Sequence, residues 1–315
     1  MEYCERMSLG LPVILLAGPT GVGKTELSLR LAERFQTEII NADSMQVYRY
    51  MDIGTAKPTP EQRAQAPHHL LDLVFPDEPF DAGIYLKYAE PAITELHLCG
   101  KVPLVVGGTG LYLKVLSHGI CEVAPGDVAV RERLRGELQE SGLVHLYREL
   151  QCVDPVLAER LQSRDRQRIV RALEVFRLTG KPLSSWQADH GFCQTRYRPI
   201  KVFVTRPREE LYDRVNQRVQ AMLARDFLGE VKSLLERGYG PALKSMQSLG
   251  YRQLAAHLRG ECSLEEALQS MQRDTRRYAK RQLTWFRSDP QYAWLPADNA
   301  ELVFRHIESC LLGKT

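Results

Sequence analysis

Short apolar runs alternate with helical patterns in the first third of the chain. Residues 13–17 and 104–106 are wholly apolar, and residues 38–40 end in two isoleucines. Runs of this length predict buried strands. Apolar residues recur at helical spacing in residues 26–32, and residues 82–99 form a second helical pattern, which Asp81 precedes and Gly100 ends. Strands that alternate with helices predict a parallel sheet.

The middle and the end of the chain have a different pattern. Residues 45–80 contain five prolines and predict long functional loops, whereas residues 119–199 show no convincing strand. That segment has helical patterns rich in Arg and Leu, at 130–140 and 165–178, which Pro155 and Pro182 interrupt. Residues 201–204 predict a returning strand, and residues 208–237, 264–271 and 273–286 predict helices.

A phosphate-binding loop separates the first predicted strand from the first predicted helix. Residues 18–25 read G-x-x-x-x-G-K-T, and the strand-loop-helix context is the one that this motif requires. Backbone N–H groups of such a loop surround phosphate oxygens at the positive end of the following helix. The loop predicts a diphosphate or triphosphate site, with a lysine charge and a threonine hydroxyl for Mg²⁺, at Gly18, Pro19, Thr20, Gly21, Val22, Gly23, Lys24 and Thr25.

These patterns together predict an α/β protein. We expect a P-loop NTPase-like core with a parallel sheet, plus an inserted all-helical domain. The expected boundaries are 1–118 for the first part of the core, 119–199 for the helical insertion, and 200–315 for the final strand and the C-terminal helices.

The composition indicates where the protein acts and which classes of protein are excluded. The 315 residues are 44% hydrophobic and 26% charged, and no apolar run approaches the roughly 20 residues that a membrane span needs. The N-terminus carries Glu2 and Glu5 rather than a signal sequence, so we expect a cytoplasmic protein without a membrane partner. Seven scattered cysteines without a C-x-x-C pair argue against a disulfide framework and a zinc site. Nothing in the sequence requires more than a monomer.

Basic residues concentrate near the C-terminus. Residues 271–287 contain six Lys and Arg side chains against the single acid Asp274. Such a local excess is typical of a surface that binds a polyanion. Tyr278 and Trp285 add the aromatic groups that RNA loops stack on. The alternative is a solvated basic helix with Trp285 and Phe286 in the core.

Two further turns are expected at the edge of the sheet where ligands bind. Asp43 follows the strand at 38–40, and Thr109 lies in the glycine-rich turn 107–110 after the next strand. Asp43 suits a general base, but a loop-capping role fits its position equally well. From its position alone, Thr109 could be merely a turn residue whose hydroxyl is satisfied locally.

Eight blocks of the sequence resemble one family, the tRNA dimethylallyltransferases, also called tRNA isopentenyltransferases, of the bacterial type. The blocks are residues 18–25, 41–48, 51–58, 68–72, 106–112, 165–174, 249–253 and 280–287. The resemblance implies transfer of a dimethylallyl group from dimethylallyl diphosphate to N6 of the adenosine next to the anticodon on its 3′ side. The acceptors would be tRNAs that read codons beginning with U, with the target base flipped into the core.

The resemblance also implies roles for individual residues. Asp43, Thr109 and Lys24 would be catalytic, Thr25 would bind Mg²⁺, and the loop would hold the leaving diphosphate. By position rather than resemblance, Arg208 and Arg214 flank the start of a predicted helix near the returning strand and are candidates for clamping the diphosphate. Arg208 is assigned to that site, although solvated helix arginines fit at least as well. The implied contacts to the tRNA anticodon stem-loop are Asp43, Ser44, Met45, Gln46, Thr109, Arg131, Gln167, Arg168, Ile169, Val170, Arg171, Gln247, Gly250, Tyr251, Arg252, Lys280, Arg281, Gln282, Leu283, Thr284, Trp285, Phe286 and Arg287.

Other classes remain to be weighed. A P-loop kinase would bind ATP in the loop and use Asp43 to activate an acceptor hydroxyl. An adenylate isopentenyltransferase would prenylate a free nucleotide, and a non-catalytic RNA-binding protein would leave the P-loop unexplained. The Arg-rich insertion and residues 280–287 favour tRNA as the acceptor, because a free nucleotide needs no long basic surface. His68 and His69 are expected to be structural, since no third metal ligand with suitable spacing is visible.

Overall fold

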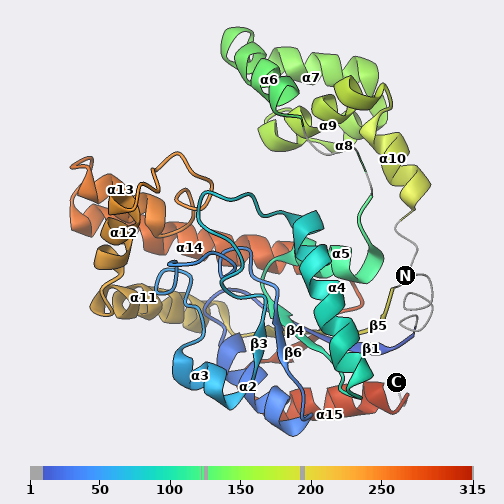
Figure 1. Cartoon of the computed structure of the whole chain (residues 1–315), viewed down its shortest axis with the longest axis vertical. Helices are drawn as coiled ribbons and strands as arrows, with labels where there is room; N and C mark the ends of the chain where they lie inside the picture. Colours follow the sequence, from blue (N-terminus) through green and yellow to red (C-terminus); the bar gives the residue numbers. More distant parts are fainter. Residues whose placement is uncertain (1–9, 122, 124–126, 192–195, 314–315) are drawn as a thin grey trace. The chain divides into compact units, whose positions relative to one another are not determined.

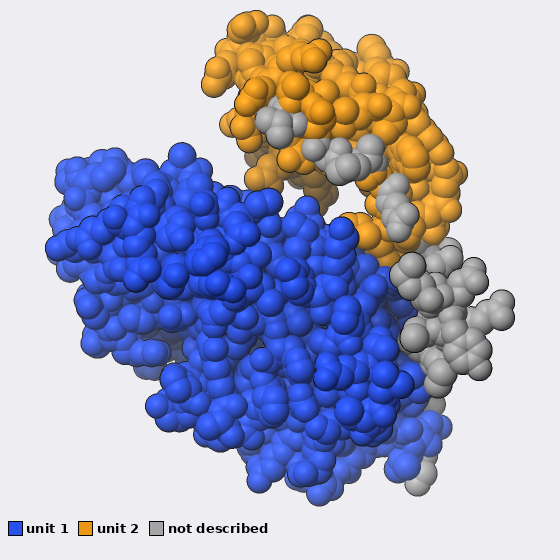
Figure 2. Space-filling model, viewed as in Figure 1, with its two compact units in different colours: residues 1–117, 196–315 blue, residues 118–195 orange. Residues whose placement is uncertain are grey.

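The computed structural model describes residues 10–121, 123, 127–191 and 196–313. The chain forms two compact units, coloured separately in Figure 2. Unit 1 comprises residues 1–117 and 196–315, and unit 2 comprises residues 118–195.

Unit 1 is built on a six-stranded parallel sheet with strand order β3-β2-β4-β1-β5-β6. Its strands are β1 (Pro12–Ala17), β2 (Ile39–Asn41), β3 (His68–His69), β4 (Leu104–Gly107), β5 (Arg198–Thr205) and β6 (Ala293–Pro296). In the centre, Ile14 of β1 pairs with Leu104 of β4 and with Ile200 of β5. The predicted fold class is therefore confirmed. The sequence patterns missed the two short edge strands β3 and β6.

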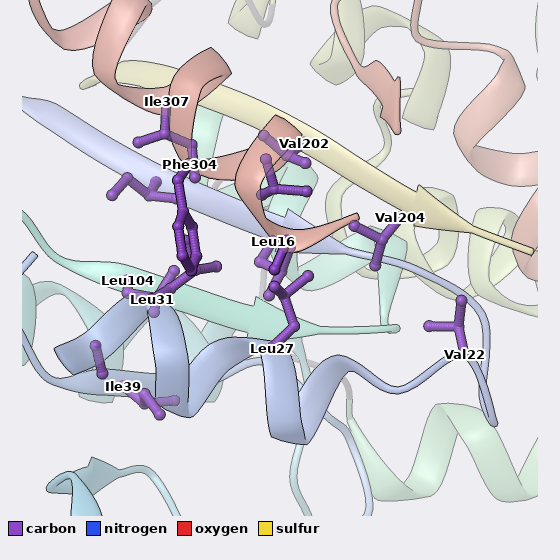
Figure 3. Close-up of a cluster of buried hydrophobic side chains, with 14 of the residues drawn as sticks. Leu16, Val22, Leu27, Leu31, Ile39, Leu104, Val202, Val204, Phe304 and Ile307 are labelled. Atoms are coloured by element: carbon purple, nitrogen blue, oxygen red, sulfur yellow. The ribbon is translucent and has the colours of Figure 1, made fainter. Parts of the chain in front are cut away.

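Helices cover both faces of this sheet (Figure 1). On one face, α2 (Lys24–Arg34) and α15 (Ala300–Leu311) form the core shown in Figure 3, where Leu31 and Phe304 lie among side chains of the central strands. Side chains of a strand alternate between faces, so Phe203 of β5 points to the opposite side from Val202. There it meets Phe286 of α14 (Leu264–Arg287), with ring centroids 4.9 Å apart. The helices α4 (Ala82–Leu98) and α5 (Gly110–His118) cover the same side as α14 (Figure 1).

The remaining helices of unit 1 correct two predictions. The expected helix 208–237 is two helices, α11 (Arg208–Ala224) and α12 (Phe227–Glu236), because Asp226 takes a left-handed φ of 67° and caps Gly229 N. The two segments expected at 264–271 and 273–286 are one 24-residue helix, α14, which starts at a Ser263–Glu266 capping box. The short helices α3 (Pro60–Gln65) and α13 (Tyr251–Leu258) complete the unit.

Helices are the only regular secondary structure in the described residues of unit 2. It contains α6 (Val128–Glu140), α7 (Gly142–Val153), α8 (Pro155–Arg160), α9 (Arg166–Thr179) and α10 (Leu183–His190). Leu146 and Leu150 of α7 pack with Ile169 and Leu173 of α9 in its own core. In the part of the chain that the structure describes, no helix combines the length and the apolarity needed to cross a membrane.

Candidate active site

The phosphate-binding loop connects β1 to α2 within unit 1. Gly23 is the N-cap of α2 and has φ 106°, a conformation that side chains disfavour. Val22 is fully buried and anchors the loop in the core. Lys24 Nζ donates hydrogen bonds to Gly18 O at 2.8 Å and to Pro19 O at 3.0 Å. Burial lowers the pKa of Lys24 to about 8, and the nearby charge of Asp43 opposes that shift.

Two arginines support the same loop, one from the turn between β5 and α11 and one from α11 itself. Arg206 Nε donates to Val22 O at 2.9 Å, and Arg214 Nε donates to Gly21 O at 3.0 Å. One turn further along α11, Arg218 lines the cavity at the loop. Burial lowers the pKa of Arg218, while Asp43 stabilises its charged form.

The arginine assigned to the diphosphate from the sequence lies elsewhere. Arg208 is exposed and stacks on Tyr212, 5.1 Å from the ring centroid. It is not among the residues that line the cavity, whereas Arg214 and Arg218 are. The sequence reasoning missed Arg218. Its spacing of four residues from Arg214 puts both on one helix face, which is the signal that could have found it.

Asp43 lies in a loop whose own hydrogen bonds fix its position. Asn41 Oδ1 accepts from Asp43 N at 3.1 Å, and Asp43 Oδ1 accepts from Met45 N at 2.8 Å. The Thr109 hydroxyl oxygen accepts from Ser44 N at 3.1 Å. The structure therefore brings the turn at Thr109 against the loop that carries Asp43.

One cavity of about 880 Å³ joins these elements. Thr20, Lys24 and Thr25 of the phosphate-binding loop line it, and so do Asp43 and Gln46. Gly54, Thr55 and Ala56 also line it. The rest of its wall comes from α11, from α13 and the turn before it, and from α14, and includes Arg214, Arg218, Gln247, Tyr251, Arg252, Arg277, Tyr278 and Arg281. A phosphate-binding loop, a carboxylate and a strongly basic wall thus share one open cavity.

A carboxylate at the edge of the cavity groups several of these cations. Asp274 Oδ2 accepts from Arg252 Nη2 at 2.6 Å, and Asp274 also pairs with Arg273 and Arg277 at 3.4 and 3.5 Å. Gln46, which also lines the cavity, donates from Nε2 to Thr55 O and Ala56 O, both at 3.2 Å.

Residues 280–287 divide between surface and core. Lys280, Arg281, Thr284 and Arg287 are exposed, and Trp285 is 40% exposed. Phe286 is buried, and Leu283 packs against the core cluster of the sheet. Gln282 is also buried. Its side-chain oxygen and nitrogen both form hydrogen bonds with backbone groups, so no polar group of the amide loses its partner on burial. Phe286 is only 2% exposed, which does not fit the expected tRNA contact there, whereas Gln282 lines the cavity and its expected contact stays a prediction. The alternative that Trp285 lies in the core is wrong.

The block at 249–253 also contributes side chains to the interior. Gly250 takes φ 89° ahead of α13, and Tyr251 is 1% exposed. Its hydroxyl donates to Glu230 Oε1 at 2.7 Å, and burial raises the pKa of Tyr251 well above its usual value. Gln247 Nε2 donates to Pro241 O at 2.6 Å.

Two of the predicted tRNA contacts in unit 2, Arg131 and Arg171, pair with the same buried acid. Glu174 is 2% exposed, and it pairs with Arg131 of α6 at 2.5 Å and with Arg171 of α9 at 2.7 Å. Gln167 and Arg168 are exposed. Ile169 is fully buried and Val170 packs partly against the unit's core, which corrects the expectation that the Ile169 side chain contacts tRNA.

The donor set for a metal is small. No group of three His, Cys, Asp or Glu residues that could hold an ion occurs among the residues that the structure describes. His69 Nε2 lies 2.7 Å from Glu38 Oε2, and His68 Nδ1 lies 2.8 Å from Ala66 O. Thr25, beside Lys24 on the cavity wall, is the hydroxyl that fits Mg²⁺, an ion that takes most of its ligands from phosphates and water.

The fold and this cavity define a class: P-loop α/β proteins whose phosphate-binding loop and a nearby carboxylate open on one basic cavity. Comparison with known proteins gives the family. The family described as IPP transferase matches residues 46–289, and the family described as isopentenyl transferase matches residues 11–72. The chain belongs to the IPP transferase family.

Individual relatives agree with that assignment. The chain is 62% identical to the tRNA dimethylallyltransferase of Syntrophobacter fumaroxidans, over 95% of this chain and 88% of that one. A solved full-length tRNA isopentenylpyrophosphate transferase of Bacillus halodurans is 37% identical, with a TM-score of 0.72 over 96% of this chain and 97% of that one. A solved eukaryotic dimethylallyltransferase acting on tRNA is 30% identical, with a TM-score of 0.79 over 91% and 74% of the two chains.

Proposed function

We propose that this protein transfers a dimethylallyl group from dimethylallyl diphosphate to N6 of the adenosine that follows the anticodon in tRNAs reading codons that begin with U. The observation that carries the proposal is the shared cavity: the phosphate-binding loop and Asp43 open on it together, and cations of α11, α13 and α14 complete its wall. The relatives' names supply the prenyl group and the tRNA.

The diphosphate of the donor binds at the loop. Lys24 and Arg218 put two positive charges beside it, and the backbone N–H groups at the start of α2 point toward the same anion. As the allylic C–O bond breaks, negative charge grows on the departing diphosphate. Fixed cations in a partly buried site stabilise that charge more strongly than water would.

Asp43 takes the proton from the attacking amine. Its Oδ1 already accepts a hydrogen bond from Met45 N, and no described residue donates to Oδ2, which can accept the N6 proton. The new C–N bond forms as the C–O bond breaks, the proton goes to Asp43, and the electron pair leaves with the diphosphate. An exocyclic amine is a weak nucleophile, so removing its proton during attack lowers the barrier.

The acceptor occupies the other end of the cavity. We assign the basic wall around Arg252, Arg277 and Arg281 to the RNA backbone, and the exposed Trp285 to stacking. In unit 2, Arg131 and Arg171 extend the predicted tRNA contacts, together with Gln167 and Arg168. Thr109 acts here by holding Ser44, next to Asp43.

Mg²⁺ would be held by the Thr25 hydroxyl and by oxygens of the diphosphate. When bound, it would neutralise charge on the leaving group. One chain carries every group named here, so we propose a monomer that acts in the cytoplasm, where tRNA is found.

Incorporation of labelled prenyl tests the proposal. The purified chain, Mg²⁺ and labelled dimethylallyl diphosphate are incubated with unmodified tRNA or with free adenosine monophosphate, and labelled ATP with a nucleoside is run in parallel. We expect label in tRNA only, at the adenosine 3′ to the anticodon. Prenylated mononucleotide, or phosphoryl transfer from ATP without prenylated tRNA, would contradict the proposal.

A further inference from the structure

The side-chain amide of Gln282 connects the two glycine-rich turns of the cavity. Gln282 Oε1 accepts from Thr20 N at 2.9 Å, and Gln282 Nε2 donates to Gly108 O at 2.9 Å. A backbone N–H can only donate and a carbonyl can only accept, so these two partners fix the orientation of the amide. The side chain is 6% exposed.

One partner of Gln282 lies on the donor side of the site, and the other lies in the turn next to the loop that carries Asp43. Thr20 lies in the loop assigned to the donor diphosphate. Gly108 precedes Thr109, whose N–H donates to Ala42 O at 3.3 Å and whose hydroxyl accepts from Ser44 N. A chain of hydrogen bonds therefore runs from the phosphate-binding loop, through one side chain of α14, to both neighbours of Asp43.

The turn at Gly108 is built for this contact. A Cβ at Gly108 would lie 2.2 Å from Gln282 Nε2, so any larger residue would push the amide away. The supporting helix is 24 residues long and carries Arg277 and Arg281 on the cavity wall. Gln282 is thus a buried brace, meaning a side chain that links two turns by hydrogen bonds, and it lies on a long helix. The exposed residues next to it on that helix are predicted RNA contacts.

We propose that Gln282 is a positioning residue, which sets the separation between the donor diphosphate and Asp43. The inference rests on the proposed function and deepens it, because it separates residue 282 from the RNA contacts on either side of it. Rates of transfer depend steeply on the approach of the reacting atoms, and a misplacement of about 1 Å costs on the order of 100-fold. Loss of the brace should therefore slow chemistry while each substrate still binds.

The test compares Gln282→Met and Gln282→Glu with wild type and with the control Gln269→Met. Gln269 is an exposed glutamine of the same helix, paired with Glu265. The measurements are the single-turnover rate of prenyl transfer, the Kd of dimethylallyl diphosphate, the Kd of tRNA, and the melting temperature. We expect the rate to fall about 100-fold in Gln282→Met, with both Kd values within about threefold of wild type. The control should match wild type throughout.

Gln282→Glu adds a readout that a general loss of stability would not give. A neutral carboxylic acid can accept from Thr20 N and donate to Gly108 O, as glutamine does, whereas a carboxylate can only accept. Burial disfavours the carboxylate. Lys24, Arg281 and Asp43 line the same cavity as Gln282; the two cations would favour a carboxylate there, and Asp43 would oppose it. Lowering the pH should therefore restore the rate of Gln282→Glu relative to wild type at each pH.

Several results would overturn the inference. If the Gln282 variants bind tRNA with a raised Kd but react at the wild-type rate when tRNA is saturating, Gln282 is an RNA contact rather than a positioning residue. Loss of binding of both substrates with a large fall in melting temperature would reduce it to a structural residue, and wild-type behaviour of both variants would remove any role. If wild type itself transfers no prenyl group to tRNA, the proposed function fails, which is a separate outcome.

Discussion

The buried ammonium of Lys24 should make kcat/KM for the donor depend on pH, by an amount that can be calculated. Its pKa is lowered to about 8, mainly by burial. The free enzyme should bind an anion at the loop when Lys24 is protonated and lose that attraction above this pKa. With a pKa of about 8, the protonated fraction is about 0.9 at pH 7 and about 0.09 at pH 9. The value of kcat/KM for dimethylallyl diphosphate should therefore fall about tenfold over this range, and about tenfold per unit above it.

The assay measures initial rates at low donor and saturating tRNA from pH 6.5 to about 10, with kcat measured separately at saturating donor. A bound diphosphate raises the pKa of the ammonium, so the fall in kcat should begin at a higher pH than the fall in kcat/KM. Lys24→Arg is the control, because its guanidinium stays charged throughout. A flat wild-type profile, or the same fall in Lys24→Arg, would refute the assignment of Lys24 to the donor anion.

Three further predictions follow from the same geometry. Arg218→Met should raise the KM for the donor by about 10- to 100-fold, the range expected for one charged hydrogen bond, whereas Arg208→Met should stay within about twofold; equal effects would return Arg208 to the site. Gly107→Val should lower the free energy of unfolding by about 3 kcal/mol in denaturant titration, because its Cβ would lie 2.1 Å from Ala42 O; a wild-type midpoint would show that the two strand ends can separate. Chelation of divalent metal should reduce turnover by at least about 100-fold and added Mg²⁺ should restore it, so activity that survives chelation would argue against a metal at Thr25.

Local signals explain what could be predicted from the sequence. The phosphate-binding loop is a contiguous motif whose glycine spacing and flanking elements are visible without a fold. Asp43 could be placed because the carboxyl ends of parallel strands meet at one edge of a sheet. The central strands β1, β4 and β5 are apolar runs that need no tertiary context to be recognised.

Tertiary contacts decide what could not be predicted. Gln282 belongs to a basic block, yet its neighbours across the fold, Thr20 and Gly108, make it a buried brace. Arg218 faces the cavity rather than solvent only because α11 packs beside the phosphate-binding loop. The break between α11 and α12 comes at Asp226, without a glycine or proline to mark it, and β6 is too short to stand out.

In the proposed reaction, one cavity aligns the prenyl donor with the N6 amino group of adenosine, from which Asp43 takes the proton. The most direct test of this proposal is the single-turnover rate of prenyl transfer by Asp43→Asn, measured together with the Kd values of tRNA and dimethylallyl diphosphate. We expect a rate lower by at least about 100-fold, the scale of general-base catalysis, with both Kd values near those of wild type. A near-normal rate in Asp43→Asn, with both substrates bound, would contradict it.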